Sequence, residues 1–352
     1  MNSQCPELTT KLESLKTLKQ QFDLEFTKIK NLDSKKSDDL IFIRNIKSKL
    51  NQTLQDFQNK IWIETLELAQ ESLKTQYEAQ VDLLRKNNLL KTLTTGELGI
   101  EAIDKQEYPI PTLEQIKETI LEKPEFFKTK INQGFVKLVL VPFGLPISSL
   151  KEAYGDALTE HHQQGKLLDT QNKPLELKGE PINDLVEYAK ADEKGDLVYF
   201  PQEYSKTTHQ GKTKQELLPT QAWQVLLLED SPDLPAEGQG KIIAKRQQPE
   251  ANQSPNSYLK QLQTDPQYKG EQGLTPESWL VYALSHLEQT SQVIDNYQGS
   301  GKACYLLSSC FKEFGSVPFA GFGRGRARVY LVQYDPDDSG SDGTGRFAVS
   351  IS

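Results

Sequence analysis

The sequence predicts an α+β protein in which a long helical N-terminal region precedes a loop-rich part with short strands. Between Pro6 and Pro109 there is no proline and hardly any glycine. Apolar residues recur there at steps of three and four, as they do on one face of an amphipathic helix. After Tyr108 the pattern changes, and β-branched apolar runs alternate with turns bounded by glycine and proline, as in short strands.

Two helical patterns make up the N-terminal region. The first runs from Leu8 to Ile29, a polar turn follows at residues 31–39, and the second runs from Ile43 to Asn87-Asn88. A helix as long as the second is typical of a helical hairpin or coiled coil. The narrow apolar stripe with charged flanks favours an oligomerisation stalk, with a homo-oligomer formed through residues 7–90. The alternative is a bundle that packs on its own chain.

Compositional breaks divide the chain into four segments. They are a helical coiled-coil region (1–108), a Pro-bounded linker with a short helix (109–133), a small α/β module (134–218) and a C-terminal domain (219–352). In the linker, Thr112-Leu-Glu-Gln115 resembles a capping box, which predicts a helix that ends before Pro124.

The two C-terminal segments contain the predicted strands. In the module we expect a buried strand within 134–144, a helix over 147–163, and short strands near 175–177 and 196–200. In the C-terminal domain, Ser254-Pro255 and Thr275-Pro276 each begin a helix, because Ser or Thr caps it and proline needs no N–H in the first turn. Strands are expected at 223–228, 328–333 and 346–351, with a long loop over 335–343.

Composition excludes several classes of protein. The net charge of -8 argues against nucleic-acid binding. No run of 18 apolar residues predicts a membrane span, and no apolar segment follows the N-terminus as in a secretory signal. We therefore expect a cytoplasmic protein, with surface display by another route as the open alternative. The three cysteines, Cys5, Cys304 and Cys310, are too few and odd in number for a disulfide framework, although a Cys304–Cys310 bridge is open.

No motif for catalysis, a cofactor or a metal is complete. Gly299-Ser-Gly-Lys-Ala303 lacks the first glycine and the Ser/Thr of a phosphate loop. The loop from Asp335 resembles the front of a Ca²⁺ loop, but Arg346 stands where the bidentate acid is required. His161 and His162 are adjacent, so they face different directions on a helix. We therefore predict no catalytic residue, no cofactor and no metal.

The residue types change abruptly near the C-terminus. The last Lys is Lys312, and from Phe314 to Ser352 there is no Lys, Glu, Met or Trp and only one Gln, Gln333. Tyr, Arg, Ser, Gly and Asp are interleaved there with apolar residues. These residue types are typical of binding loops, because Tyr and Arg give large contacts at a low entropic cost and the small polar residues give adaptable hydrogen bonds. A glycine-rich, loop-heavy end to a domain is the alternative.

The C-terminal part resembles the target proteins of diversity-generating retroelements. The resemblance covers roughly residues 219–352, and more weakly 134–218. It rests on Trp223–Glu229, Leu274–Trp279, His286–Glu288, Val293–Tyr297, Val317–Ala320, Asp335-Pro336 and Gly345–Val349. It implies a C-type-lectin-like fold, related to that of the formylglycine-generating enzyme, whose surface is varied by error-prone copying at adenines. The sequence departs from the family pattern at Gly321-Phe322, where larger aromatic residues are usual, so a shallower ligand pocket is expected.

Codon arithmetic links this resemblance to the change in residue types. Mutation of an Asn codon at its adenines reaches Tyr, Ser, Gly, Asp, Arg, Cys, Phe, Val and Ala, among others, but not Lys, Glu, Gln, Met or Trp. The unreachable set is nearly the set that is missing after Phe314, with Gln333 as a fixed position. The resemblance thus places a variable region at about 303–344, with Leu331, Pro336 and Phe347 as framework.

The expected function is non-enzymatic binding of a protein or glycan ligand. The predicted ligand-binding residues are Tyr305, Ser308, Ser309, Phe319, Gly321, Phe322, Gly323, Gly325, Arg326, Arg328, Tyr330, Val332, Tyr334, Asp337, Asp338, Ser341 and Asp342. Two alternatives remain open. One is an enzyme of the formylglycine-generating type that uses Cys304 and Cys310 with a metal, and the other is a purely structural coiled-coil protein.

Overall fold

A computed structural model describes residues 4–31, 37–68, 70–184 and 188–351. The chain is a mixed α+β protein, as the sequence predicts. It divides into two compact units. The first comprises residues up to Glu67 together with Lys117–Glu125, and the second comprises Leu68–Ile116 and the chain from Phe126 onward. Within the described residues, no helix combines the length and the apolar character needed to cross a membrane.

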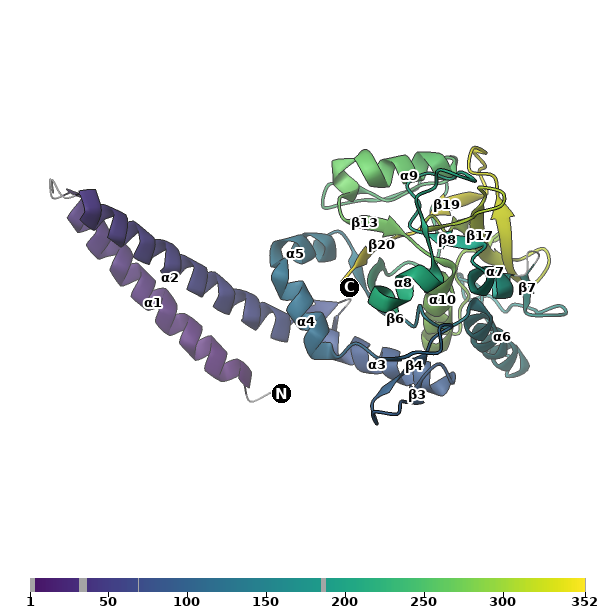
Figure 1. The fold of residues 1–352 in the computed structure, drawn as a ribbon, viewed down its shortest axis with the longest axis horizontal. Coiled ribbons are helices and arrows are strands. Elements are labelled where there is room, and N and C mark those ends of the chain that lie inside the picture. The colour runs from purple at the N-terminus through teal and green to yellow at the C-terminus, as the bar shows by residue number, and fades with distance from the viewer. Residues whose placement is uncertain (1–3, 32–36, 69, 185–187, 352) are drawn as a thin grey trace. The chain divides into compact units, whose positions relative to one another are not determined.

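The first unit is built on two long helices, α1 (Gln4–Asn31) and α2 (Ser37–Glu64), which lie side by side (Figure 1). Leu12 and Leu54 are buried, and the Lys47 ammonium lies 2.6 Å from the Asp23 carboxylate. The polar turn expected at 31–39 falls largely outside the described residues.

The second predicted helix is shorter than expected. We predicted a continuous pattern to Asn87-Asn88, but α2 ends at Glu64, and a short hairpin of β1 (Glu67–Leu68) and β2 (Glu71–Ser72) follows. Ser72 then caps α3 (Leu73–Lys86), because its side-chain oxygen accepts a hydrogen bond from the Thr75 N–H at 3.0 Å. The segment 1–108 is also not wholly helical, since β3 (Lys91–Thr92), β4 (Leu98–Glu101) and β5 (Glu107–Pro109) form a small sheet within it.

Helix α3 covers the edge of strand β6 (Phe135–Val141) through two buried glutamines. Gln76 Oε1 accepts the Leu138 N–H at 2.8 Å and Gln80 Oε1 accepts the Leu140 N–H at 3.3 Å. Residues four apart on a helix are separated by nearly the same distance as residues two apart on a strand. Gln76 and Gln80 can therefore each bind one of the alternate strand residues Leu138 and Leu140. This edge therefore offers no free row of N–H groups to another strand.

Four antiparallel strands form the central sheet of the second unit, in the order β13 (Glu271–Gly273), β20 (Phe347–Ser350), β10 (Gln224–Glu229) and β6. Helices α6 (Ile147–Gln163) and α10 (Pro276–Thr290) pack together, and Tyr154 meets Trp279 edge to face at 6.1 Å. Both helices begin where the sequence predicts, and α6 also ends at the predicted residue. The Thr275 cap is part of a complete capping box.

A second sheet carries the C-terminal strands. Its order is β19 (Gly343–Gly345), β15 (Ala303–Tyr305), β17 (Val317–Gly323), β18 (Arg328–Tyr334) and β7 (Ile182–Asp184), and β14 (Asn296–Tyr297) pairs with β17. A third sheet has the order β16 (Ser309–Phe311), β8 (Leu197–Tyr199) and β9 (Lys212–Thr213). Strand β8 lies within the predicted 196–200 segment. The strand expected near 175–177 is absent, since Leu168 and Pro174 form only an isolated bridge there.

Residues 134–218 contribute strands to the same sheets as residues 219–352. Strand β6 pairs with β10, β7 with β18 and β8 with β16. The predicted α/β module and C-terminal domain thus belong to one compact unit. The remaining elements are α4 (Leu113–Glu122), α5 (Pro124–Asn132), α7 (Tyr188–Lys194), α8 (Lys214–Gln221), α9 (Pro255–Thr264), the 3₁₀ turn Pro266–Tyr268, and the short hairpin of β11 (Ile242–Ile243) and β12 (Arg246–Gln247).

Buried charges tie the sheets to the helices. The Lys214 ammonium lies 2.5 Å from Asp192 and 2.8 Å from Glu277, and all three side chains are fully buried. Tyr199 donates a hydrogen bond to Glu277 at 2.6 Å. Burial and the Glu277 charge raise the pKa of Tyr199 well above its ordinary value, so this phenol keeps the proton that it donates.

A buried ion pair also holds the start of strand β20, through Arg346 immediately before it. The Arg346 guanidinium lies 2.5 Å from Asp295 and donates to the Ser231 carbonyl at 2.7 Å. Trp279 Nε1 donates to the other Asp295 oxygen at 2.8 Å. Arg346 stands where a Ca²⁺-binding loop would need a bidentate acid. In the structure it is instead the buried partner of Asp295.

Candidate binding surface on strands β17 and β18

Strand β18 alternates between core and surface. It pairs antiparallel with β17 along its whole length, with Leu331 opposite Ala320 and Val332 opposite Phe319. Val329 and Leu331 are fully buried, whereas Tyr330 and Val332 are partly exposed. Successive side chains on a strand point to opposite faces, so Leu331 belongs to the framework and Tyr330 and Val332 belong to the open face.

An aromatic cluster lies beside these residues. The ring centroids of Tyr305, Phe319 and Tyr334 are separated by 5.1 Å (Tyr305 to Phe319), 4.9 Å (Tyr305 to Tyr334) and 5.2 Å (Phe319 to Tyr334). Tyr305 is fully buried, and Phe319 and Tyr334 are partly exposed. Burial raises the pKa of Tyr334 and of Tyr305, so both phenols are neutral in the physiological range. Phe319 and Tyr334 thus offer ring faces and the neutral Tyr334 hydroxyl to a ligand, and Tyr305 supports them from below.

Two glycines let the rings lie close to the sheet. A Cβ atom on Gly323 would overlap Cε2 of Tyr330. A Cβ atom on Gly343 would come within 2.5 Å of Tyr305 Cζ and 2.7 Å of Phe319 Cε2. Only glycine allows this close approach. Gly323 and Gly343 therefore help to determine where the aromatic side chains lie.

Two polar loops border the open face. Gly325 and Arg326 are exposed in the turn between β17 and β18, and the Arg326 guanidinium lies 5.5 Å from the Tyr330 ring centroid. In the loop after β18, Asp337 accepts a hydrogen bond from Asn256 Nδ2 at 2.8 Å. The face thus has an aromatic and aliphatic centre between a basic turn and an acidic loop.

The structure places the seventeen predicted residues in three groups. Exposed are Gly325, Arg326, Asp337, Asp338, Ser341 and Asp342, and partly exposed are Phe319, Arg328, Tyr330, Val332 and Tyr334. Buried are Tyr305, Ser308, Ser309, Gly321, Phe322 and Gly323.

For the buried group, the expectation of surface exposure is corrected. Ser308 and Ser309 donate their hydroxyls to the Gly273 carbonyl at 2.8 Å and the Leu306 carbonyl at 3.1 Å. Phe322 is fully covered. These side chains support the scaffold and do not face solvent.

Sequence reasoning missed Arg324. It is exposed in the same turn as Arg326, and its guanidinium lies 3.8 Å from the carboxylate of Asp169. The signal was present, because Arg324 is one of the four arginines that follow the last lysine. Phe314 was missed as well, and it is 54% exposed.

The two C-terminal cysteines are free thiols in the core. Cys304 and Cys310 are fully buried and not bridged. Burial raises the pKa of Cys310 to about 12 and also raises that of Cys304. Neither thiol has the exposed, electropositive surroundings that produce a reactive thiolate. Across the residues that the structure describes, no group of three or more His, Cys, Asp or Glu side chains is placed to hold a metal ion.

Comparison with known proteins adds no relative. No family model matches the chain, and the same is true of curated proteins and of solved structures.

Proposed function

We propose that this chain is a non-enzymatic binding protein whose ligand contacts the open face of β17 and β18 and the two loops beside it. One observation carries the proposal: no exposed or partly exposed position from Phe314 to Ser350 holds Lys or Glu. Protein surfaces normally carry both in abundance. Tyr, Arg, Asp, Ser and Gly occupy most of these positions, and they suit recognition of a protein or glycan.

The absence of Lys and Glu also supports diversification of this face by adenine mutagenesis. Every exposed or partly exposed residue type from Phe314 to Ser350 except Gln333 is reachable from an Asn codon mutated at its adenines. Gln333 accepts a hydrogen bond from the Ser316 hydroxyl at 3.0 Å, as suits a fixed position. Ordinary selection for a polar surface gives no reason to avoid Lys and Glu, whereas this mutational mechanism does.

The fold part of the proposal is a C-type-lectin-like domain that presents this face. The support is the arrangement of two packed helices, α6 and α10, with a C-terminal strand that returns to the central sheet beside β10. The helical hairpin of the first unit would serve to oligomerise or space these domains. No observation favours the thiol enzyme, because both candidate thiols are buried.

Sequencing the gene and its surroundings tests the diversification. We expect a near-copy of the 3′ coding end that differs only at adenines, close to a reverse transcriptase gene. Its Asn codons should align with exposed or partly exposed positions such as Arg326, Tyr330 and Asp338. Its codons for Leu331 and Phe347 should be identical to those of the gene. If the locus contains no such repeat, the proposed diversification is wrong.

A further inference from the structure

A cavity of about 430 Å³ lies at the end of strand β10, and none of the predicted ligand-binding residues lines it. Its walls come from β6, the loop at 230–235, the β11–β12 hairpin and Ser300. The volume falls within the range of small-molecule sites, roughly 300–1,000 Å³. The lining combines carboxylates with apolar side chains, so the cavity has the two features that a small amphipathic ligand requires.

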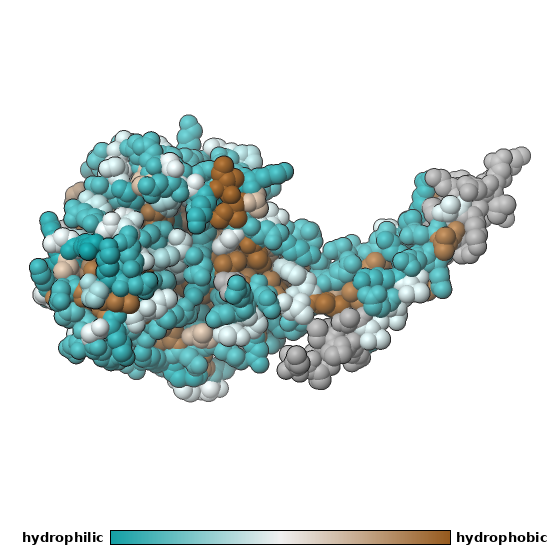
Figure 2. All heavy atoms as spheres, turned by 180° about the vertical axis from the view of Figure 1, so that it is seen from behind, coloured by the Kyte–Doolittle hydropathy of each residue, from teal (hydrophilic) through white to brown (hydrophobic). Residues whose placement is uncertain are grey.

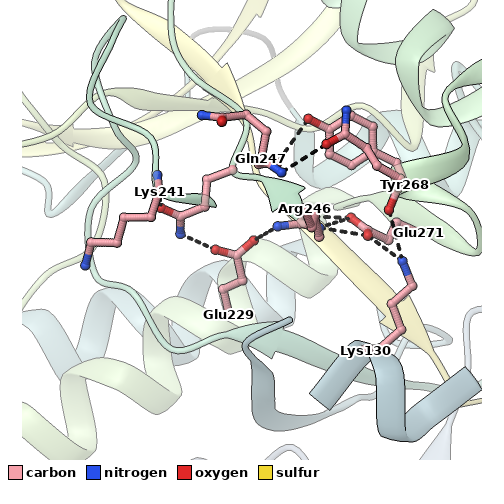
Figure 3. Close-up of polar contacts among 9 residues, drawn as sticks. Lys130, Glu229, Lys241, Arg246, Gln247, Tyr268 and Glu271 are labelled. Atoms are coloured by element: carbon pink, nitrogen blue, oxygen red, sulfur yellow. Dashed lines mark hydrogen bonds and ion pairs between the residues drawn. The ribbon is translucent and has the colours of Figure 1, made fainter. Parts of the chain in front are cut away.

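The first carboxylate in the cavity, Glu229, is held in one position from behind (Figure 3). Arg246 Nη1 donates to Glu229 Oε1 at 2.6 Å, and Gln248 Nε2 donates to Glu229 Oε2. Arg246 is itself fixed, because it binds Glu271 at 2.7 Å and Lys130 binds Glu271 at 2.6 Å. A carboxylate held in this way loses little conformational entropy when it binds a ligand.

A second carboxylate, Asp233, is fixed on another wall. Thr170 donates its hydroxyl to Asp233 Oδ2 at 2.5 Å, and the Asn296 N–H donates to Oδ1 at 3.3 Å. Asn296 also lies against Ser300, its Nδ2 being 3.4 Å from the Ser300 hydroxyl. Its Oδ1 atom is buried and has no hydrogen-bond donor among the described residues. Asn296 itself does not line the cavity, so the acceptor that this wall offers is the Asp233 carboxylate, which suits a ligand that brings donors.

The charges that line the cavity do not balance. Glu229, Asp230 and Asp233 are negative, and Lys241 is the only cation among the lining residues. In Figure 3 the Lys241 side chain extends away from Glu229. Arg246 and Lys130 together balance Glu229 and Glu271, so the excess negative charge of the lining comes from Asp230 and Asp233. The excess negative charge in a concave site attracts a cation.

The apolar part of the lining restricts the kind of cation. Leu234, Ile243 and Val136 contribute hydrocarbon surface beside the carboxylates. An ammonium group on a methylene chain matches both parts, because the amine donates charge-assisted hydrogen bonds and the chain covers apolar surface. A bare hydrated metal ion would make no use of the apolar wall.

We propose that this cavity binds a small aliphatic amine, with its ammonium group between the carboxylates of Glu229 and Asp233 and its methylene chain against Leu234 and Ile243. The inference goes beyond the binding face on β17 and β18, and neither depends on the other.

Titration calorimetry of the full chain with 1,4-diaminobutane at low salt tests the proposal, with 1,4-butanediol as the uncharged probe. We expect saturable binding of the diamine with one molecule per cavity and no binding of the diol. The Asp233→Asn variant should bind the diamine about tenfold more weakly, since it removes one charge-assisted contact. Asp156→Asn, which removes the same charge from the exposed side of α6, should bind like the parent.

A second variant keeps the test decisive if Asp233→Asn fails to fold. Ile243→Lys breaks no hydrogen bond of the cavity and places an ammonium group in its lining, so it should abolish diamine binding while the circular dichroism spectrum is unchanged. The proposal is overturned if the parent shows no saturable binding. It is equally overturned if Ile243→Lys binds like the parent, or if Asp156→Asn weakens binding as much as Asp233→Asn, which would indicate general charge attraction.

Discussion

The Tyr330 ring lies against the backbone of Gly323, in space that any larger residue at position 323 would occupy. Gly323 belongs to β17 and Tyr330 to the neighbouring strand β18. The contact keeps the ring on the open face of the sheet, beside the exposed Arg326. The absence of a side chain at Gly323 thus determines how the Tyr330 ring lies on the open face.

Substitution of Gly323 tests this relationship. Gly323→Ala should displace the Tyr330 ring and lower the free energy of unfolding by about 1 kcal/mol, the lower range for overpacking, because the ring is partly exposed and can move. Denaturant unfolding measures this cost. In a Tyr330→Ala background the cost should disappear, since the two positions are coupled. An equal cost in both backgrounds would show that the ring does not meet Gly323.

The ion network around Arg246 should be essential for stability. Arg246 is fully buried, and Arg246→Met leaves Glu271 with one cationic partner, Lys130. Breaking such a buried pair costs roughly 3–5 kcal/mol in the free energy of unfolding. Urea titration should show this loss, and the matched change Arg326→Met in the exposed turn should alter stability by less than about 0.5 kcal/mol. Equal effects of the two changes would refute the network.

Stability should fall in mild acid because of His286. Burial, only partly offset by a hydrogen bond to Gln292, lowers the pKa of His286 below 6.5. Because the pKa of His286 is lower in the folded state, folding favours the neutral ring. The contribution of His286 to the free energy of unfolding is therefore complete above about pH 6.5 and is lost as the pH falls through the folded-state pKa. Melting temperatures between pH 7.5 and 5 measure the effect. His286→Gln should flatten the profile and the partly exposed His162→Gln should not. A profile that is unchanged in His286→Gln would contradict this assignment.

The buried thiols should be unreactive in the native protein. In a Cys5→Ser background, a thiol reagent such as 5,5′-dithiobis(2-nitrobenzoate) at pH 8 should label Cys304 and Cys310 only after denaturation, because both are covered and protonated. Mass spectrometry of the labelled protein distinguishes the two sites. Rapid labelling of either cysteine in the folded chain would revive the thiol-enzyme alternative.

The sequence predicted correctly the helices whose starts are determined by residues close to them in the chain. Helix α10 begins at Pro276 because Thr275 caps it, and α6 follows its apolar period closely. The end of α2 was missed because apolar residues continue at helical spacing past Glu64. The interruption there comes from a short hairpin and from the Ser72 cap, which a periodic pattern does not show.

The candidate site was only partly predictable for a related reason. Alternation along β18 separates Leu331 from Tyr330 correctly, because a strand reveals its faces in its own sequence. The burial of Tyr305 depends on Phe319 and Tyr334, which reach it from other strands. The buried Arg246 gave no sequence signal, since its partner Glu271 lies 25 residues away.

The most direct test of the central claim is a selection for binding. A display library should vary Arg326, Tyr330, Val332, Asp338 and Ser341 among the residue types reachable from Asn codons, and a matched library should vary the buried Val329, Leu331, Phe322, Ala320 and Phe347 in the same way. Both are selected for binding to one test protein, such as lysozyme, and the dissociation constants of the clones are measured. The account predicts folded clones specific for the target from the surface library and unfolded, non-binding clones from the buried library. It would be contradicted if the surface library lost its fold or gave no specific binder.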